Sequence, residues 1–235
     1  MDSSYSVNNA IKKSYLFVSE TNNVNNLKAL EGLGNEYDKY LSEDDFQKIS
    51  ELSDFHSIET DFSIKLKPWL LGFIFSSPRA MNPFSQDNLL KVAASNYGLA
   101  SKGLETVDEH YSVLDSLSPE DQFQILKNVL NLSEADKEKN YELMIKTYLT
   151  FNLNKILNAD EKITESIVPE KAWSSVKNEL IHKRNKLFLN RLLILAKKNV
   201  LFVAVGASHL AGDDGLLQKF LQAGFKKKSL IPFKK

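Results

Sequence analysis

The chain has 235 residues, of which 43 % are hydrophobic and 26 % are charged, proportions typical of a globular protein rather than a disordered one. Thirty basic residues balance thirty acidic ones, so the composition gives no support to a nucleic-acid-binding function that depends on a basic surplus. The absence of cysteine excludes disulfides, thiolate metal sites, Fe–S clusters and a cysteine nucleophile. No apolar run is long enough for a membrane span, and the first residues lack the apolar core of a signal peptide.

The first half of the chain alternates apolar runs with helical patterns. Residues 14–20 form a short β-prone run that ends at Glu20 and is followed by an asparagine-rich break, which predicts a strand and a loop. The pattern over residues 27–58 predicts helices with exposed charge. Pro68 begins a strongly apolar segment that predicts a buried helix running to residue 76. A further helix is expected near residues 86–97.

The second half contains a long helical region followed by the clearest strand. Residues 100–106 predict a second strand, and residues 107–196 are expected to be almost entirely helical. Residues 200–205 are apolar on both faces, which predicts a buried strand in a parallel sheet. The remaining elements expected are a helix over 215–223, capped by Asp213 or Asp214, and a last strand over 225–233. The pattern predicts an α/β fold, with a central, largely parallel sheet of few strands and a large helical middle region, as one domain over residues 1–235.

The most informative stretch follows the strand at 200–205, where Gly206-Ala-Ser-His209 precedes a helix. In open α/β sheets, ligands bind in the crevice beyond the carboxyl ends of the strands. Gly206 allows the backbone to turn sharply there, and His209 is either a functional residue or a structural one. The neighbouring Ser208 is not expected to act with His209, because successive side chains of an extended segment point apart and the nucleophile-elbow motif is absent.

Two carboxylates also stand at the ends of predicted strands, Glu20 after the first and Glu105 after the second. Each alone is typical of a solvated carboxylate or a helix-capping partner. Together with His209 they form a chemically sensible group, because carboxylate oxygen and imidazole nitrogen bind Mn, Fe, Co or Zn. A glutamate beside such an ion can act as general base to a water molecule.

Other polar residues fit ordinary surface positions. Arg184 and Asn185 lie on the long helix before the last clear strand, where Arg184 by itself would be expected on an exposed basic face. Three histidines with charged neighbours are expected at the surface, namely His56, His110 and His182. His110 has no histidine four residues away, so the zincin pattern is absent.

These blocks resemble a known family. The stretch from Val203 through Gly206-Ala-Ser-His209 and Gly212-Asp-Asp-Gly215 is similar to the C-terminal signature of the TraB/GumN family, which includes bacterial pheromone-shutdown proteins and the TIKI metalloproteases. Its other blocks are matched in the same order by Lys67-Pro68-Trp69-Leu70, Gly103-Leu104-Glu105-Thr106 and Arg184-Asn185.

The resemblance implies an α/β fold and, as in the TIKI branch of the family, divalent-metal-dependent cleavage of peptides. Carried over by position, His209 and Glu105 would be metal ligands, and Glu20 would be a further acidic member of the catalytic site. Arg184 and Asn185 would orient the substrate or stabilise a developing oxyanion. Gly206 and Gly212 would line the cofactor site. The expected cofactor is Mn, Co or Zn, and the expected partner is a peptide or small-molecule substrate.

The resemblance also implies an earlier Gly-x-x-His motif, which residues 1–19 do not contain. We therefore expect a chain that is incomplete at its N-terminus or a family member that has lost the motif. An upstream signal peptide would place the protein in the cell envelope or outside the cell; without one it would be cytoplasmic. Two functions stay open, a metal-dependent hydrolase and a catalytically degenerate protein that binds a peptide or other ligand. Haem binding has little support, because histidines are few and a Cys-x-x-Cys-His motif is absent.

Overall fold

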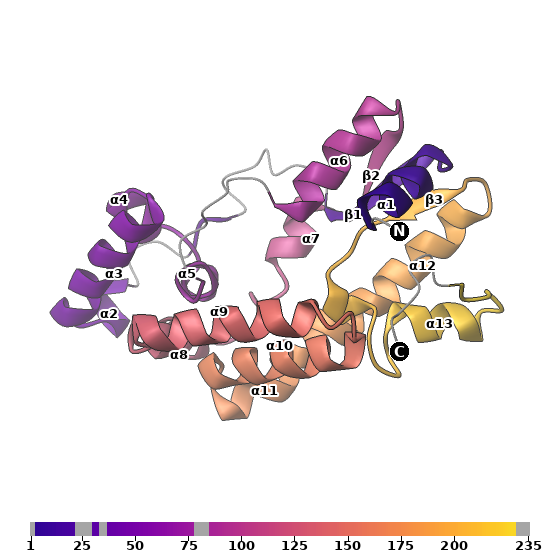
Figure 1. Ribbon diagram of the computed structural model, residues 1–235. Helices are drawn as coiled ribbons and strands as arrows, with labels where there is room; N and C mark the ends of the chain where they lie inside the picture. The colour runs from indigo at the N-terminus through magenta and orange to yellow at the C-terminus, as the bar shows by residue number, and fades with distance from the viewer. Residues whose placement is uncertain (1–2, 22–29, 33–36, 78–84, 229–235) are drawn as a thin grey trace.

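The computed structural model describes residues 3–21, 30–32, 37–77 and 85–228 (Figure 1). The strands are β1 (Leu16–Thr21), β2 (Ala100–Glu105) and β3 (Leu201–Val203). The helices up to the middle of the chain are α1 (Ser3–Lys12), α2 (Tyr37–Tyr40), α3 (Glu43–His56), α4 (Thr60–Ser63), α5 (Pro68–Phe75), α6 (Gln86–Asn96), α7 (Val107–Tyr111) and α8 (Pro119–Leu130). The later ones are α9 (Glu134–Tyr148), α10 (Leu153–Ile167), α11 (Glu170–Lys177), the π-helix η2 (Asn178–Lys183), α12 (Arg184–Ala196), the 3-10 helix η3 (Ala207–His209) and α13 (Leu216–Gln222).

The three strands form one parallel sheet in the order β2-β1-β3. Leu16 of β1 stands opposite Ala100 of β2 on one side and Leu201 of β3 on the other. Because all three strands run in the same direction, their carboxyl ends lie along one edge of the sheet. The predicted α/β fold with a small, parallel sheet and a large helical region is confirmed.

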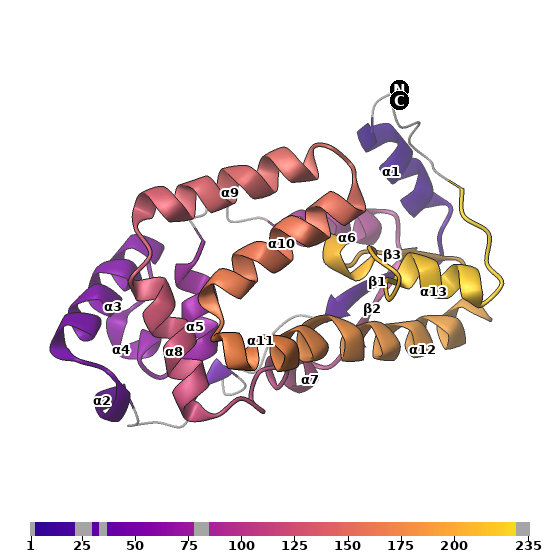
Figure 2. The same cartoon turned by 90° about the horizontal axis from the view of Figure 1, so that it is seen from below.

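Helices cover both faces of this sheet (Figures 1 and 2). Successive residues of a strand point to opposite faces, and Phe17 and Val18 accordingly belong to different clusters. Phe17 packs with Ile11 of α1 and Ala94 of α6. Val18 packs with Leu104 of β2 and with residues of α12 and α13. Helices therefore pack on both faces of the sheet, as is usual for parallel strands, and the central strand β1 contributes the buried residues Phe17 and Val18.

A second core lies in the helical region, at the far end of the molecule from the sheet (Figure 2). Its centre is α5, which begins at Pro68 as predicted and packs against α8. Leu71 and Phe75 of α5 are fully buried there with Ile125 and Leu126 of α8. Among the described residues, no helix has both the length and the apolar character needed to cross a membrane.

One long helical rod joins the two cores. It consists of α11, η2 and α12, and it begins at Glu170, within the region 107–196 that was expected to be almost entirely helical. Val176 of α11 is buried in the helical core, whereas Phe188 and Leu192 of α12 are buried against the sheet. The π-helical turn lies between these two halves, directly before Arg184.

The structure differs from the predictions in three places, namely the N-terminal segment, β3 and the C-terminal segment. Helix α1 was not predicted, although its core residues Val7 and Ile11 are four positions apart on one helical face. β3 has only one neighbouring strand among the described residues, and Val203 is 37 % exposed, so the prediction of a fully buried strand was wrong. Residues 225–228 contain no strand, and the rest of the predicted last strand lies outside the described residues.

Local details differ in two further places. Within the segment predicted as helical over 27–58, Glu31 instead forms an isolated antiparallel bridge with Leu66, and residues 27–29 and 33–36 lie outside the described residues. Gly215 precedes α13 without a side-chain cap, so the capping role predicted for Asp213 or Asp214 was wrong. Asp214 instead contacts His182 and Lys219.

Candidate metal centre

The carboxyl edge of the sheet brings together four side chains from distant parts of the sequence. Glu20 comes from the end of β1 and Glu105 from the end of β2. His209 lies in the short helix η3 that follows β3, and Arg184 is the first residue of α12. The convergence predicted for Glu20, Glu105 and His209 is therefore present.

Arg184 connects these groups. Its Nη2 donates to Glu20 Oε2 at 2.6 Å and to Glu105 Oε1 at 2.7 Å, and its Nε donates to Glu105 Oε2 at 3.2 Å. Its Nη1 lies 3.1 Å from Nε2 of His209. The Arg184 side chain is only 11 % exposed. The exposed basic face expected for Arg184 from its neighbours alone is thus wrong.

Both carboxylates are ionised by their surroundings. Burial raises the pKa of Glu105, but hydrogen bonds from His110 and Arg184 outweigh it and hold that pKa below its ordinary value. Burial also raises the pKa of Glu20, and the opposing charge of Arg184 brings it below its ordinary value. Two negative charges therefore face one guanidinium at neutral pH.

Asn185 determines the tautomer of His209. The Asn185 amide donates through Nδ2 to the backbone carbonyl of Asp214 at 3.0 Å, which leaves Oδ1 facing the imidazole. Nδ1–H of His209 donates to that oxygen at 2.7 Å, so the lone pair of the neutral ring is on Nε2, toward Arg184. Burial lowers the pKa of His209 to about 4, which keeps the ring neutral.

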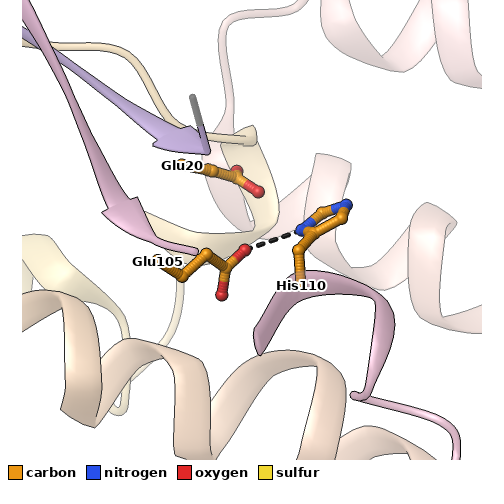
Figure 3. Close-up of side chains that lie close together, drawn as sticks. All are labelled: Glu20, Glu105 and His110. Atoms are coloured by element: carbon orange, nitrogen blue, oxygen red, sulfur yellow. Dashed lines mark hydrogen bonds and ion pairs between the residues drawn. The ribbon is translucent and has the colours of Figure 1, made fainter. Parts of the chain in front are cut away.

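His110 completes a potential metal-binding group that sequence reasoning missed. Ligand atoms of Glu20, Glu105 and His110 all lie within 4.8 Å of one another, and Figure 3 shows the three side chains turned toward a common point. His110 Nδ1 is 2.7 Å from Glu105 Oε1. His110 stays partly exposed, with 33 % of its side chain accessible, but it is not an isolated surface residue, because the short helix α7 brings its imidazole against Glu105.

The signal for this position is local. Thr106 and Glu109 form a capping box, in which each side chain receives a hydrogen bond from the other residue's backbone N–H. That box starts α7 directly after Glu105, and His110 follows in its first turn. Recognising the helix start would have placed the imidazole near the carboxylate.

The two glycines expected at the cofactor site lie in different places. The backbone N–H of Gly206 donates to Glu20 Oε1 at 2.6 Å, and a Cβ at Gly206 would lie 3.3 Å from that oxygen. Gly212 has a φ of +74° and its N–H donates to Asn154 Oδ1 at 3.3 Å. Ser208 donates to Asp160 at 2.5 Å, which agrees with the expectation that it does not act with His209.

Gly212 lines a cavity of about 520 Å³ beside the His209 loop. The cavity lies between residues 150–154, residues 210–213 and one side of α13, and it also contacts Lys227. Leu210, which directly follows His209, is one of its lining residues. The volume is in the range of small-molecule sites, about 300–1,000 Å³.

Comparison with known proteins places the chain in a family. The sequence model of the TraB/PrgY/gumN family matches residues 4–229, which is nearly the whole chain. The chain belongs to the TraB/PrgY/gumN family. Searches among curated proteins and among solved structures gave no match. Three of the segments that carried the resemblance, Gly103–Thr106, Arg184–Asn185 and Gly206–His209, meet at the sheet edge of this TraB/PrgY/gumN protein.

The donor set fits a divalent transition metal. Two carboxylates and an imidazole are ligands that Mn²⁺, Co²⁺ and Zn²⁺ accept. The separations within the group allow one ion to contact all three residues after small side-chain movements. The place between them is occupied by Arg184 Nη2, so the residues fit an ion when that guanidinium moves aside.

Proposed function

We propose that this TraB/PrgY/gumN protein is a metal-dependent hydrolase of the peptidase type, with its site at the carboxyl edge of the sheet. The observation that supports it is the group of Glu20, Glu105 and His110, whose ligand atoms lie within 4.8 Å of one another. The sequence predicts two metal ligands, Glu105 and His209. Nε2 of His209 lies 3.8 Å from Glu20 Oε1, so His209 can serve as a further ligand once Arg184 has moved aside.

Each residue has a separate task in this proposal. Glu105, whose side chain is 1 % exposed, and His110 hold the ion, which when bound supplies Lewis acidity and lowers the pKa of water. Glu20 is more exposed, at 22 %; one of its oxygens would face the ion, and the other would take a proton from the attacking water. Arg184 stabilises negative charge that develops on the substrate. Asn185 acts through His209 as a positioning residue, because both ends of its amide are engaged.

The cavity beside the His209 loop is the proposed substrate-binding region. Its lining combines leucine and phenylalanine side chains with Asn154, Asp213 and Lys227, a mixture that suits a peptide or a small molecule with both polar and apolar parts.

The test is hydrolysis of a mixed peptide library, followed by mass spectrometry, with Mn²⁺, Co²⁺ or Zn²⁺ added after chelator treatment. We expect metal-stimulated cleavage that falls at least 100-fold in Glu105→Gln. The control is Asp108→Asn, which removes an exposed carboxylate three residues away and should leave cleavage unchanged. Cleavage that survives chelation, or that Glu105→Gln does not reduce, would contradict the proposal.

A second candidate function is a binding protein without turnover. The observation that favours it is the engagement of both carboxylates by Arg184, which satisfies them without a metal. Peptides retained by the protein but never cleaved, with or without added metal, would support this alternative over the hydrolase.

A further inference from the structure

Arg184 Nη2 lies at the centre of the three residues that form the metal-binding group. It is 2.6 Å from Glu20 Oε2, 2.7 Å from Glu105 Oε1 and 3.4 Å from His110 Nδ1 (the residues shown in Figure 3). A transition-metal ion contacts oxygen and nitrogen ligands at about 2.0–2.2 Å. A metal ion and this nitrogen therefore compete for the same place.

The guanidinium also saturates the acceptors that a metal would use. Both oxygens of Glu105 accept hydrogen bonds from Arg184. One oxygen of Glu20 accepts a hydrogen bond from Arg184, and the other accepts one from the backbone N–H of Gly206. Nε2 of His209 faces Arg184 Nη1 at 3.1 Å. Each oxygen of Glu20 and Glu105 thus accepts at least one hydrogen bond without any ion.

The surroundings hold the guanidinium in this position. Arg184 Nη1 donates to the carbonyl of Leu180 in the π-helical turn at 3.3 Å, and Cζ lies 5.1 Å from the centre of the Phe188 ring. The guanidinium thus has an aromatic ring on one side and donates to both carboxylates, and such paired hydrogen bonds are the reason that arginine is selective for carboxylates.

We propose that Arg184 is the resident cation of this site, and that metal binding displaces it from Glu20 and Glu105. The site then has two states that exclude each other, one filled by the guanidinium and one filled by a divalent ion. In the second state Arg184 is free to contact an anionic group of the substrate. This inference rests on the metal site of the proposed function and adds a means of regulating its occupancy.

The test is calorimetric titration of the full chain with Mn²⁺, comparing wild type with Arg184→Met, which removes the charge and keeps most of the length. We expect Arg184→Met to bind Mn²⁺ at least 10-fold more tightly than wild type, and its melting temperature to rise further on Mn²⁺ addition. The control is Arg191→Met, on the same helix, whose guanidinium pairs with Glu109 instead. It should bind Mn²⁺ as wild type does.

Three further variants make the result decisive. Adding Glu105→Gln to Arg184→Met should abolish the gain, because the ion would lose its most buried ligand. If Arg184→Met does not fold without metal, Arg184→Lys is used in its place. A single ammonium cannot reach all of the acceptors, so Arg184→Lys should also bind Mn²⁺ at least 10-fold more tightly than wild type. The matched control Arg191→Lys should show no such gain.

The possible failures differ from one another. Tight Mn²⁺ binding by wild type with no gain in the Arg184 variants would overturn the competition and leave the metal site of the proposed function intact. No Mn²⁺ binding by any variant would overturn both the competition and the metal site. Tighter binding without peptide cleavage would support the competition and contradict only the hydrolase.

Discussion

Replacing Asn185 with leucine should destabilise the protein through two lost hydrogen bonds. The side chain is completely buried and joins Nδ1–H of His209 to the backbone carbonyl of Asp214. Leucine has a similar shape, so the main loss is the pairing of these two groups. An unpaired buried polar group costs about 1–3 kcal/mol. Because the Asp214 residue is half-buried and regains water in part, we expect a total loss of about 2–4 kcal/mol.

The assay is urea unfolding of Asn185→Leu together with Asn190→Leu, the same change at an exposed position of the same helix. The control should change the free energy of unfolding by less than about 0.5 kcal/mol. In ¹⁵N NMR spectra, His209 should be the Nδ1–H tautomer in wild type at neutral pH and should lose that preference in Asn185→Leu. Equal stability of the two variants, or an unchanged tautomer, would refute the assigned role of Asn185.

Two other predictions concern the turns and ion pairs around the site. Gly215→Ala should lower the free energy of unfolding by about 1–3 kcal/mol, because its Cβ would lie 2.1 Å from the Ala211 carbonyl oxygen. Gly98→Ala, which meets open space at a φ of +76°, should cost only about 1 kcal/mol in the same denaturation assay, and equal costs would contradict the clash. The hydrogen bond from Arg191 lowers the pKa of Glu109 to about 2, so the native state favours the ionised form and gains stability above the ordinary pKa of 4.5. The melting temperature of Glu109→Gln should therefore be below that of wild type at pH 7, by an amount corresponding to about 1 kcal/mol or less. This difference in melting temperature should disappear as the pH falls from 4.5 toward 2. A difference that is constant with pH would argue against the ion pair.

The sequence predicted the part of the site that depends on strand ends. Glu20, Glu105 and His209 each stand at or just after the end of a predicted strand, and parallel strands bring their carboxyl ends to one edge regardless of the helices between them. The same logic could not show how buried each strand is. An apolar run such as 201–203 has the same pattern at the edge of a sheet as at its centre, and only the pairing order distinguishes them.

The remaining part of the site depends on geometry that no periodicity encodes. His110 reaches the carboxylates because α7 starts immediately after β2 and turns back within one turn. The central position of Arg184 depends on the direction in which α12 leaves the π-helical turn, and neighbouring lysines made this residue look like part of a solvated face. Tertiary packing, rather than local composition, selected these two side chains.

The π-helical turn of η2 also sets the angular phase between the two ends of the rod. A turn of this kind contains one residue more than an α-helical turn, and one residue corresponds to about 100° of rotation in an α-helix. With α11 fixed in the helical core, an uninterrupted α-helix would carry the Arg184 side chain round the axis and away from Glu20 and Glu105. The extra residue allows one continuous helical rod to bury the apolar face of α11 in the helical core and, at the same time, to direct the Arg184 side chain toward the edge of the sheet.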